Sequence, residues 1–228
     1  MKKIMSMFLI LTCILSFSSM FLNSNILSAN ENKELTEIIN KQQKVKKFQT
    51  DVRLKIKNSA TQESTFEFTY YYHEPDLVHL ETDDFVLLPS DPLKSLQPEF
   101  LKLDNYTLSL EKESISENNK IQVYSMKPIN ETENYWLKIW INIVEKNIEK
   151  AKVFFLIPNY KKEFSLNIKY KQVNEYSMPA YVEGNIAIPN KFGINGKIKE
   201  FKDGYIYLEL DNYKINKDFS NNIMKKLK

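Results

Sequence analysis

The sequence has few of the residues on which most catalytic sites depend. Its 228 residues include one cysteine, two histidines and four glycines. Because the cysteine, Cys13, lies in an N-terminal apolar run, the rest of the chain cannot hold a disulfide, a thiolate metal site or a cysteine nucleophile. The sequence has neither a Gly-x-Ser-x-Gly elbow nor a glycine-rich phosphate loop. We therefore expect no cofactor and no catalytic residue. Of the three hypotheses for function that we consider, an uncharacterised hydrolase comes last.

The sequence also lacks a large excess of charge of either sign. The chain has 32 Lys and Arg against 29 Asp and Glu, a formal net charge of +3. The two signs are interspersed, as in Glu111-Lys112-Glu113, which is typical of a solvated surface rather than a basic binding stripe. We expect no nucleic-acid partner.

The N-terminus resembles a secretory signal peptide. Lys2 and Lys3 precede an apolar run, Met7–Leu22, which is shorter than the ~20 residues needed to span a bilayer. Leu27-Ser28-Ala29 then offers a cleavage site. We expect residues 1–29 to be removed and residues 30–228 to form a single domain in the periplasm or an equivalent extracytoplasmic space. An uncleaved membrane anchor is the alternative.

Hydrophobic periodicity predicts one helix followed by many strands. From Glu31 to Phe48 the apolar residues keep the three-and-four spacing of an amphipathic helix. The period then becomes two, which predicts strands. Besides the alternation that begins at Val52, we expect strands near 66–72, 106–110, 121–123, 137–143, 153–157, 164–170, 181–188, 196–201 and 205–213. A sheet of about ten strands usually curls or closes.

Short turns indicate that these strands are antiparallel neighbours. Turn signals occur at Asn118-Asn119, at Lys146-Asn147 and at Asp203-Gly204, where glycine suits a tight hairpin. The segment Pro89–Leu101 interrupts the strands, and its prolines favour two short helices over the sheet, although a plain loop is the alternative. Residues 218–228 could form a last helix.

Two small clusters have functional and purely structural interpretations. His73 and His79 flank the turn Glu74-Pro75-Asp76, where they could face each other across a hairpin, but two histidines beside a polar turn are more often surface residues than a metal site. Trp136 and Trp140 share one strand face with Lys138, which suits either a covered central strand or an exposed stacking surface. We expect no metal and prefer the covered strand.

At the residue level the chain resembles the LolA-like superfamily, which includes periplasmic outer-membrane lipoprotein carriers. The likeness lies in the segments Val45–Val52, Tyr71–Val78, Leu137–Asn142 and Asp211–Asn216 and in the order of the elements. The resemblance implies a mainly β (α+β) fold, in which a curled antiparallel sheet forms an unclosed barrel. The N-terminal helix and the short helices would cover its concave face, which in these carriers holds acyl chains.

On this resemblance, apolar side chains of the sheet and of the covering helices line a lipid cavity. Such a cavity needs apolar walls, because moving an acyl chain from water into an apolar site is favourable by about 0.8 kcal/mol per buried methylene. The alternative is that these side chains only pack the core. The candidates on the sheet are Phe66, Phe68, Tyr70 and Tyr72, or the set that faces the opposite way. Those on the covering helices are Leu93, Leu96, Phe100 and Leu101.

The resemblance also suggests partners. A carrier would bind lipoprotein acyl chains or free lipid, exchange them with a membrane-anchored donor or acceptor, and act as a monomer. The second hypothesis is an envelope sensor of the same fold that binds a membrane-anchored regulator. Glu74 is a departure from the family, because the well-known carriers tend to have a basic residue before this proline, and it puts the lipoprotein hand-over mechanism in doubt.

Overall fold

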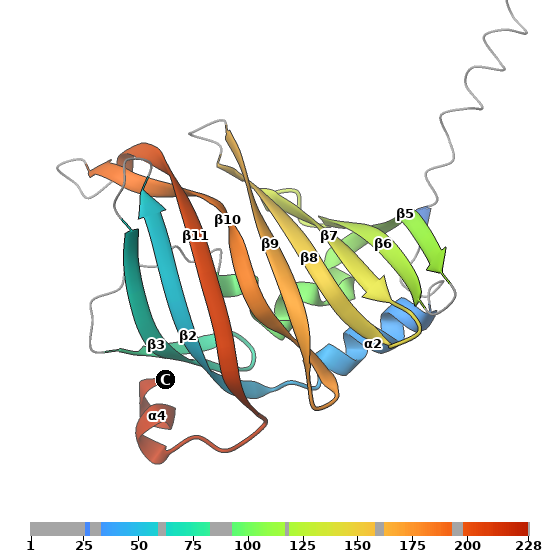
Figure 1. Cartoon of the computed structure of the whole chain (residues 1–228), viewed down its shortest axis with the longest axis horizontal. Coiled ribbons are helices and arrows are strands. Elements are labelled where there is room, and N and C mark those ends of the chain that lie inside the picture. Colours follow the sequence, from blue (N-terminus) through green and yellow to red (C-terminus); the bar gives the residue numbers. More distant parts are fainter. Residues whose placement is uncertain are drawn as a thin grey trace, which may run out of the picture.

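The computed structural model contains one large antiparallel sheet and few helices (Figure 1). It describes residues 26–27, 33–58, 63–82, 93–116, 119–157, 162–192 and 198–227. The helical elements are α2 (Lys33–Gln42), the 3-10 turns η1 (Pro98–Leu101) and η2 (Leu103–Asn105), and α4 (Asn221–Lys226). The strands are β1 (Ile26–Leu27), β2 (Lys47–Asn58), β3 (Glu63–His73), β4 (Leu77–Glu81), β5 (Tyr106–Ser116), β6 (Asn119–Pro128), β7 (Tyr135–Asn142), β8 (Asn147–Ile157), β9 (Lys162–Val173), β10 (Tyr176–Phe192) and β11 (Ile198–Ile215).

The strands lie in the order β1-β5-β6-β7-β8-β9-β10-β11-β2-β3-β4. Every pair is antiparallel, and the sheet remains open, with β4 at one edge and the two-residue β1 beside β5 at the other. The predicted mainly β fold of about ten strands is therefore confirmed. The chain passes from β4 to β5, and so from one side of the sheet to the other, through η1 and η2.

The first and last long strands in the sequence, β2 and β11, pair with each other inside the sheet. Beyond this ladder, the Asn216 side-chain oxygen accepts a hydrogen bond from the Lys46 backbone N–H at 2.9 Å. The Asn216 amide donates to the Lys44 carbonyl at 3.0 Å. Asn216 itself has a φ of 53°, a conformation that asparagine tolerates better than most residues. It fixes the entry to β2 against the exit from β11.

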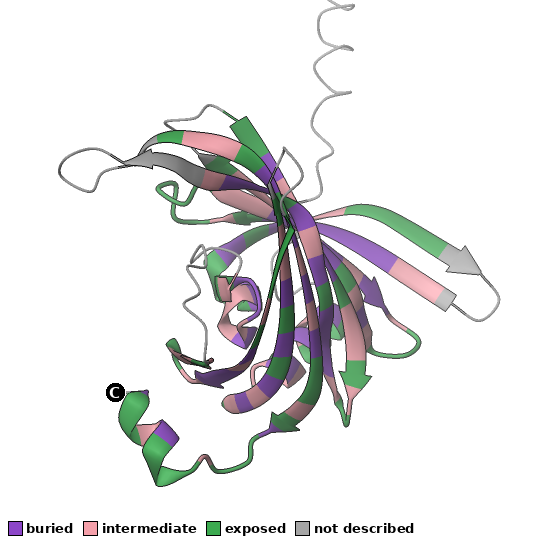
Figure 2. Ribbon diagram, turned by 60° about the vertical axis from the view of Figure 1, so that its left-hand side comes forward, coloured by how far each residue is buried: buried purple, intermediate pink, exposed green. Residues whose placement is uncertain are grey.

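Alternation along the strands separates an inner from an outer face of the sheet (Figure 2). On β2, Val52 and Leu54 are buried while Asp51 and Arg53 are exposed, as expected for strands with one face on the core. The inner-face side chains of the central strands join one continuous hydrophobic core. The sheet curves around this core (Figures 1 and 2).

Helix α2 and residues 93–105 cover the inner face. Leu35, Ile38 and Ile39 of α2 are buried in the same core as the sheet residues. The helix is shorter than the predicted Glu31–Phe48, since it ends at Gln42 and β2 begins at Lys47. Val45 and Phe48 are nevertheless buried, so the apolar spacing continued across the helix-to-strand junction.

The predicted hairpin turn at Asp203-Gly204 is wrong. Both residues lie inside β11, where Gly204 pairs with Ile186, and the two strands expected at 196–201 and 205–213 are one. Glycine is needed here for space rather than for a turn, since a Cβ on Gly204 would lie 2.1 Å from Cδ1 of Ile188. The turn at Lys146 is confirmed and has a φ of 52°.

The C-terminal helix forms as predicted and packs on the outer face. Ser220 caps α4 by accepting a hydrogen bond from the Ile223 N–H, and Ile223 and Leu227 bury against Tyr71 of β3. Within the described residues, no helix combines the length and apolar character needed to span a bilayer. The predicted leader and its cleavage site lie outside the described residues, apart from Ile26–Leu27.

Candidate ligand-binding concavity

The structure brings the predicted cavity residues together on the inner side of the sheet. Phe66, Phe68, Tyr70 and Tyr72 alternate along the inner face of β3, and the last three are buried. Leu93, Leu96, Phe100 and Leu101 belong to residues 93–105, which we call the lid. All eight lie in, or pack against, the one hydrophobic core. Sheet and lid are therefore in apolar contact in this structure.

Side chains from the end of α2 and from β5 and β7 hold the lid. The Gln43 side-chain amide, just after α2, donates to the Pro98 carbonyl at 2.7 Å. The Tyr106 hydroxyl donates to the Phe100 carbonyl, and the Phe100 ring stacks on Tyr135 with 5.3 Å between centroids. Residues 93–105 form no strand ladder with the sheet, so these contacts and the buried leucines hold them in place.

Of the two short helices that the sequence predicted, the second is present in the lid. Pro98 begins η1, as expected from its fixed φ, and η2 follows at once. The proposed caps for an earlier helix, Ser90 and Asp91, lie outside the described residues. Because η1 and η2 have no more than four residues each, their position depends on buried side chains such as Leu101 and Leu103.

The polar atoms of the concavity are mostly neutral. Burial raises the pKa of the hydroxyl groups of Tyr70 and Tyr72, both on β3. The Tyr72 hydroxyl donates to the Pro75 carbonyl at 3.2 Å, whereas the buried Tyr70 hydroxyl lacks a partner of normal hydrogen-bond geometry among the described residues. The Gln97 side chain lies near the Tyr70 hydroxyl and partly offsets the rise that burial causes in the pKa of Tyr70.

Buried charge is absent from the part of the chain that the structure describes. The buried polar residues there are Gln42, Thr50, Ser95, Gln122, Ser125, Asn142 and Ser177. Desolvating an unpaired charge is costly, which accounts for the neutral side chains on the inner side of the sheet. The described residues also include no group of three His, Cys, Asp or Glu side chains placed to hold a metal ion.

The two histidines do not face each other directly. His73 lies opposite Leu77, and His79 lies opposite Tyr71, on which its ring stacks with 6.0 Å between centroids. The turn between β3 and β4 is present as predicted. Glu74 forms an ion pair with Lys46, so its carboxylate is neutralised locally.

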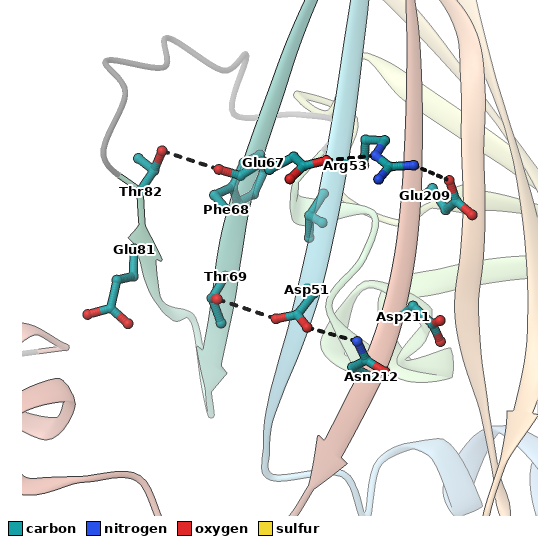
Figure 3. Close-up of a pocket in the computed structure, with 11 residues that line it drawn as sticks. Asp51, Arg53, Glu67, Phe68, Thr69, Glu81, Thr82, Glu209, Asp211 and Asn212 are labelled. Carbon is teal, nitrogen blue, oxygen red and sulfur yellow. Dashed lines mark hydrogen bonds and ion pairs between the residues drawn. The ribbon is translucent and has the colours of Figure 1, made fainter.

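A second concave region, a groove of about 630 Å³, lies on the outer face of β2, β3, β4 and β11 (Figure 3). Its lining is polar and largely acidic, and comprises Asp51, Val52, Arg53, Glu67, Phe68, Thr69, Glu81, Thr82, Glu209, Asp211 and Asn212. Nothing in the sequence distinguishes this groove, because charged residues that alternate with inward apolar ones are equally typical of a solvated surface.

Ion pairs organise this outer groove. Arg53 lies between two carboxylates, with its Nε 2.9 Å from Glu67 and its Nη1 4.0 Å from Glu209. The Lys171 ammonium lies 2.6 Å from Asp211 and lowers the pKa of that carboxyl group. Such a charged, open groove suits a polar partner and not an acyl chain.

No protein-family model matches the sequence, and no curated protein is significantly similar to it. Among solved structures, a DUF1329 family protein from Desulfovibrio piger superposes on 86% of this chain and 98% of its own, with 8% identity and a TM-score of 0.53. A protein from Vibrio parahaemolyticus described as an outer membrane lipoprotein-sorting protein domain covers 87% and 98%, with 12% identity and a TM-score of 0.53. The chain has a LolA-like fold.

A LolA superfamily protein from Nitrosomonas europaea also matches, over 83% of this chain and 96% of its own, with 13% identity and a TM-score of 0.46. At these identities the similarity establishes the fold and leaves function to the site. The resemblance suggested by the sequence is thus confirmed at the level of the fold.

Proposed function

We propose that the protein is an extracytoplasmic carrier that encloses the acyl chains of a lipid or lipoprotein between the inner face of the sheet and the lid. The observation that carries this proposal is the uncharged apolar contact between the two. Phe68, Tyr70 and Tyr72 supply one side of it, and Leu96 and Leu101 supply the other.

The position of the lid supports the proposal. It is the described part of the connection between β4 and β5, and its buried leucines pack on the inner face of the open sheet. Opening it would expose the aromatic side chains of β3, which an acyl chain could then cover. Each buried methylene would contribute about 0.8 kcal/mol, so a chain of ordinary length would bind without any polar contact.

The outer groove favours a second candidate, a sensor that binds a membrane-anchored protein. Arg53 between Glu67 and Glu209 offers paired charges that a polar protein segment could rearrange. The carrier is the better-supported function, because the groove is open and charged whereas the concavity is apolar and covered.

Binding of a fluorescent acyl probe tests the carrier function. The exported protein should bind the probe, and a competing fatty acid should displace it. Leu96→Asp should reduce this binding strongly, because a carboxylate would have to enter the apolar contact. Val144→Asp is the matched control, since Val144 is 61% exposed in the turn between β7 and β8.

Undiminished probe binding in a folded Leu96→Asp protein would contradict the role of the lid. Native mass spectrometry provides an independent measurement, in which a lipid that co-purifies should leave the protein when the probe is added. Capture of one membrane protein without any bound lipid would instead favour the sensor.

A further inference from the structure

The outer face of β7, β8 and β9 carries aromatic rings and lysines side by side. On β7 the outward residues follow each other at period two, and cross-strand pairing places β8 residues beside them. Trp136 lies opposite Phe154, and Trp140 lies opposite Lys150, which in turn lies opposite Lys169 of β9. We call these residues the aromatic–lysine patch: Trp136, Lys138, Trp140, Lys150, Lys152, Phe154 and Lys169.

The rings of this patch lie against each other and beneath the cations. Trp136 and Phe154 are stacked, with 3.8 Å between their centroids and 7° between their planes. The Lys150 ammonium is 4.4 Å from the Trp140 ring, and the Lys152 ammonium is 5.0 Å from the Phe154 ring. The two tryptophans and Phe154 are only half-buried. Apolar rings and positive charges therefore share one accessible surface.

The positive charge of the patch is largely uncompensated. Lys138 pairs with Glu111 at 2.6 Å, but Lys150, Lys152 and Lys169 form no ion pair with any residue that the structure describes. The acidic groove lies on the outer face of β2, β3, β4 and β11. That groove has five carboxylates in its lining against the single cation Arg53, so its charge is opposite in sign to that of the patch.

We propose that the aromatic–lysine patch docks the protein on the surface of a bilayer containing anionic lipids. Tryptophan rings favour the interfacial region of a membrane, and lysines are attracted to anionic head groups. The acidic groove would be repelled by the same surface, which fixes the orientation. The lid packs on the inner side of the sheet, so docking through the outer face leaves that side free. This docking does not depend on what the concavity binds.

Intrinsic fluorescence reports directly on this surface, because Trp136 and Trp140 are the only tryptophans of the chain. The exported protein is mixed with vesicles of phosphatidylcholine alone, or of phosphatidylcholine with phosphatidylglycerol. We expect co-sedimentation and a blue-shifted tryptophan emission only with the anionic vesicles, and loss of both at high salt. Absence of binding to the anionic vesicles overturns the proposal, as does binding without a change in emission.

Charge-matched variants separate the patch from the overall charge. The triple variant Lys150→Gln/Lys152→Gln/Lys169→Gln should bind anionic vesicles about a hundredfold more weakly, at roughly fivefold per lysine. The control variant Lys44→Gln/Lys217→Gln/Lys225→Gln loses the same charge from exposed positions away from both the patch and the lid, and should bind nearly as the parent does.

Circular dichroism establishes that each variant is folded. Equal losses in the two triple variants would mean that only net charge matters, and would overturn the patch as the docking surface. Binding to an anionic polysaccharide, with none to the vesicles, would assign the patch to a different partner and would also overturn the proposal.

Discussion

Truncating one leucine of the lid and one of the sheet should have different consequences for stability. Leu96 of the lid and Leu208 of β11 are 3% and 1% exposed and belong to the same core. In a closed core, either Leu→Ala change would lower the free energy of unfolding by about 2–5 kcal/mol. We expect this full loss for Leu208→Ala, because β11 is hydrogen-bonded to strands on both sides and cannot leave the sheet alone.

For Leu96→Ala we expect a loss below about 2 kcal/mol. If the lid can open while the sheet stays folded, a lid mutation cannot lower the global stability by more than the free energy of lid closure. The open form would simply become the folded state. Faster binding of an acyl probe should accompany the change, because a larger fraction of molecules would be open.

Urea denaturation followed by circular dichroism gives the two stability losses, and hydrogen exchange locates them. The backbone N–H groups of Leu96, Gln97 and Phe100 are bonded within the lid and should exchange faster in Leu96→Ala, while the amides of the sheet keep their protection. Equal stability losses in the two variants, with uniform exchange, would show that the lid is ordinary core and would refute this reasoning.

Three further predictions concern the leader, the histidines and a tyrosine. Intact-mass analysis of the exported protein should show a chain that begins at Asn30, and a full-length chain in the membrane fraction would contradict this. Changing His73 and His79 together to alanine should leave acyl-probe binding largely intact, and loss of binding in a folded protein would favour a metal-dependent or catalytic role. Burial and the hydrogen bond to Glu81 raise the pKa of Tyr71 to about 12, so the neutral phenol contributes stability that is present below pH ~10 and is lost as the pH rises through about 12. Stability curves against pH for the parent and Tyr71→Phe should therefore converge across this window, and parallel curves would exclude the effect.

The fold could be predicted largely because alternation is a local property. Phe68, Tyr70 and Tyr72 recur at period two, which put them on one face of a strand, while the choice of the inner face came from the family resemblance. The short helix η1 was recognisable from Pro98 and the apolar residues after it, because proline fixes where a short helix can begin. Both features depend on neighbours within a few positions in the sequence.

What could not be predicted depends on residues that are distant in the sequence. Gly204 looks like a turn residue, and only the pairing of β10 with β11 shows that it accommodates Ile188. The outer groove likewise depends on the register that brings Arg53 of β2 between Glu67 and Glu209. A single sequence does not contain the register of non-local strand pairs, so neither feature could be inferred from it.

The seam between β2 and β11 has a consequence for the order in which the protein is assembled. Lys46 and Asn216, which are hydrogen-bonded there, are 170 residues apart in sequence. A chain that crosses a membrane from its N-terminus would present β2, β3 and β4 long before β11 arrives to pair with them. Contacts of such high sequence separation form slowly, and an unpaired strand edge can associate with other chains in the meantime. We therefore expect the nascent protein to need protection by a chaperone until its last long strand has been released.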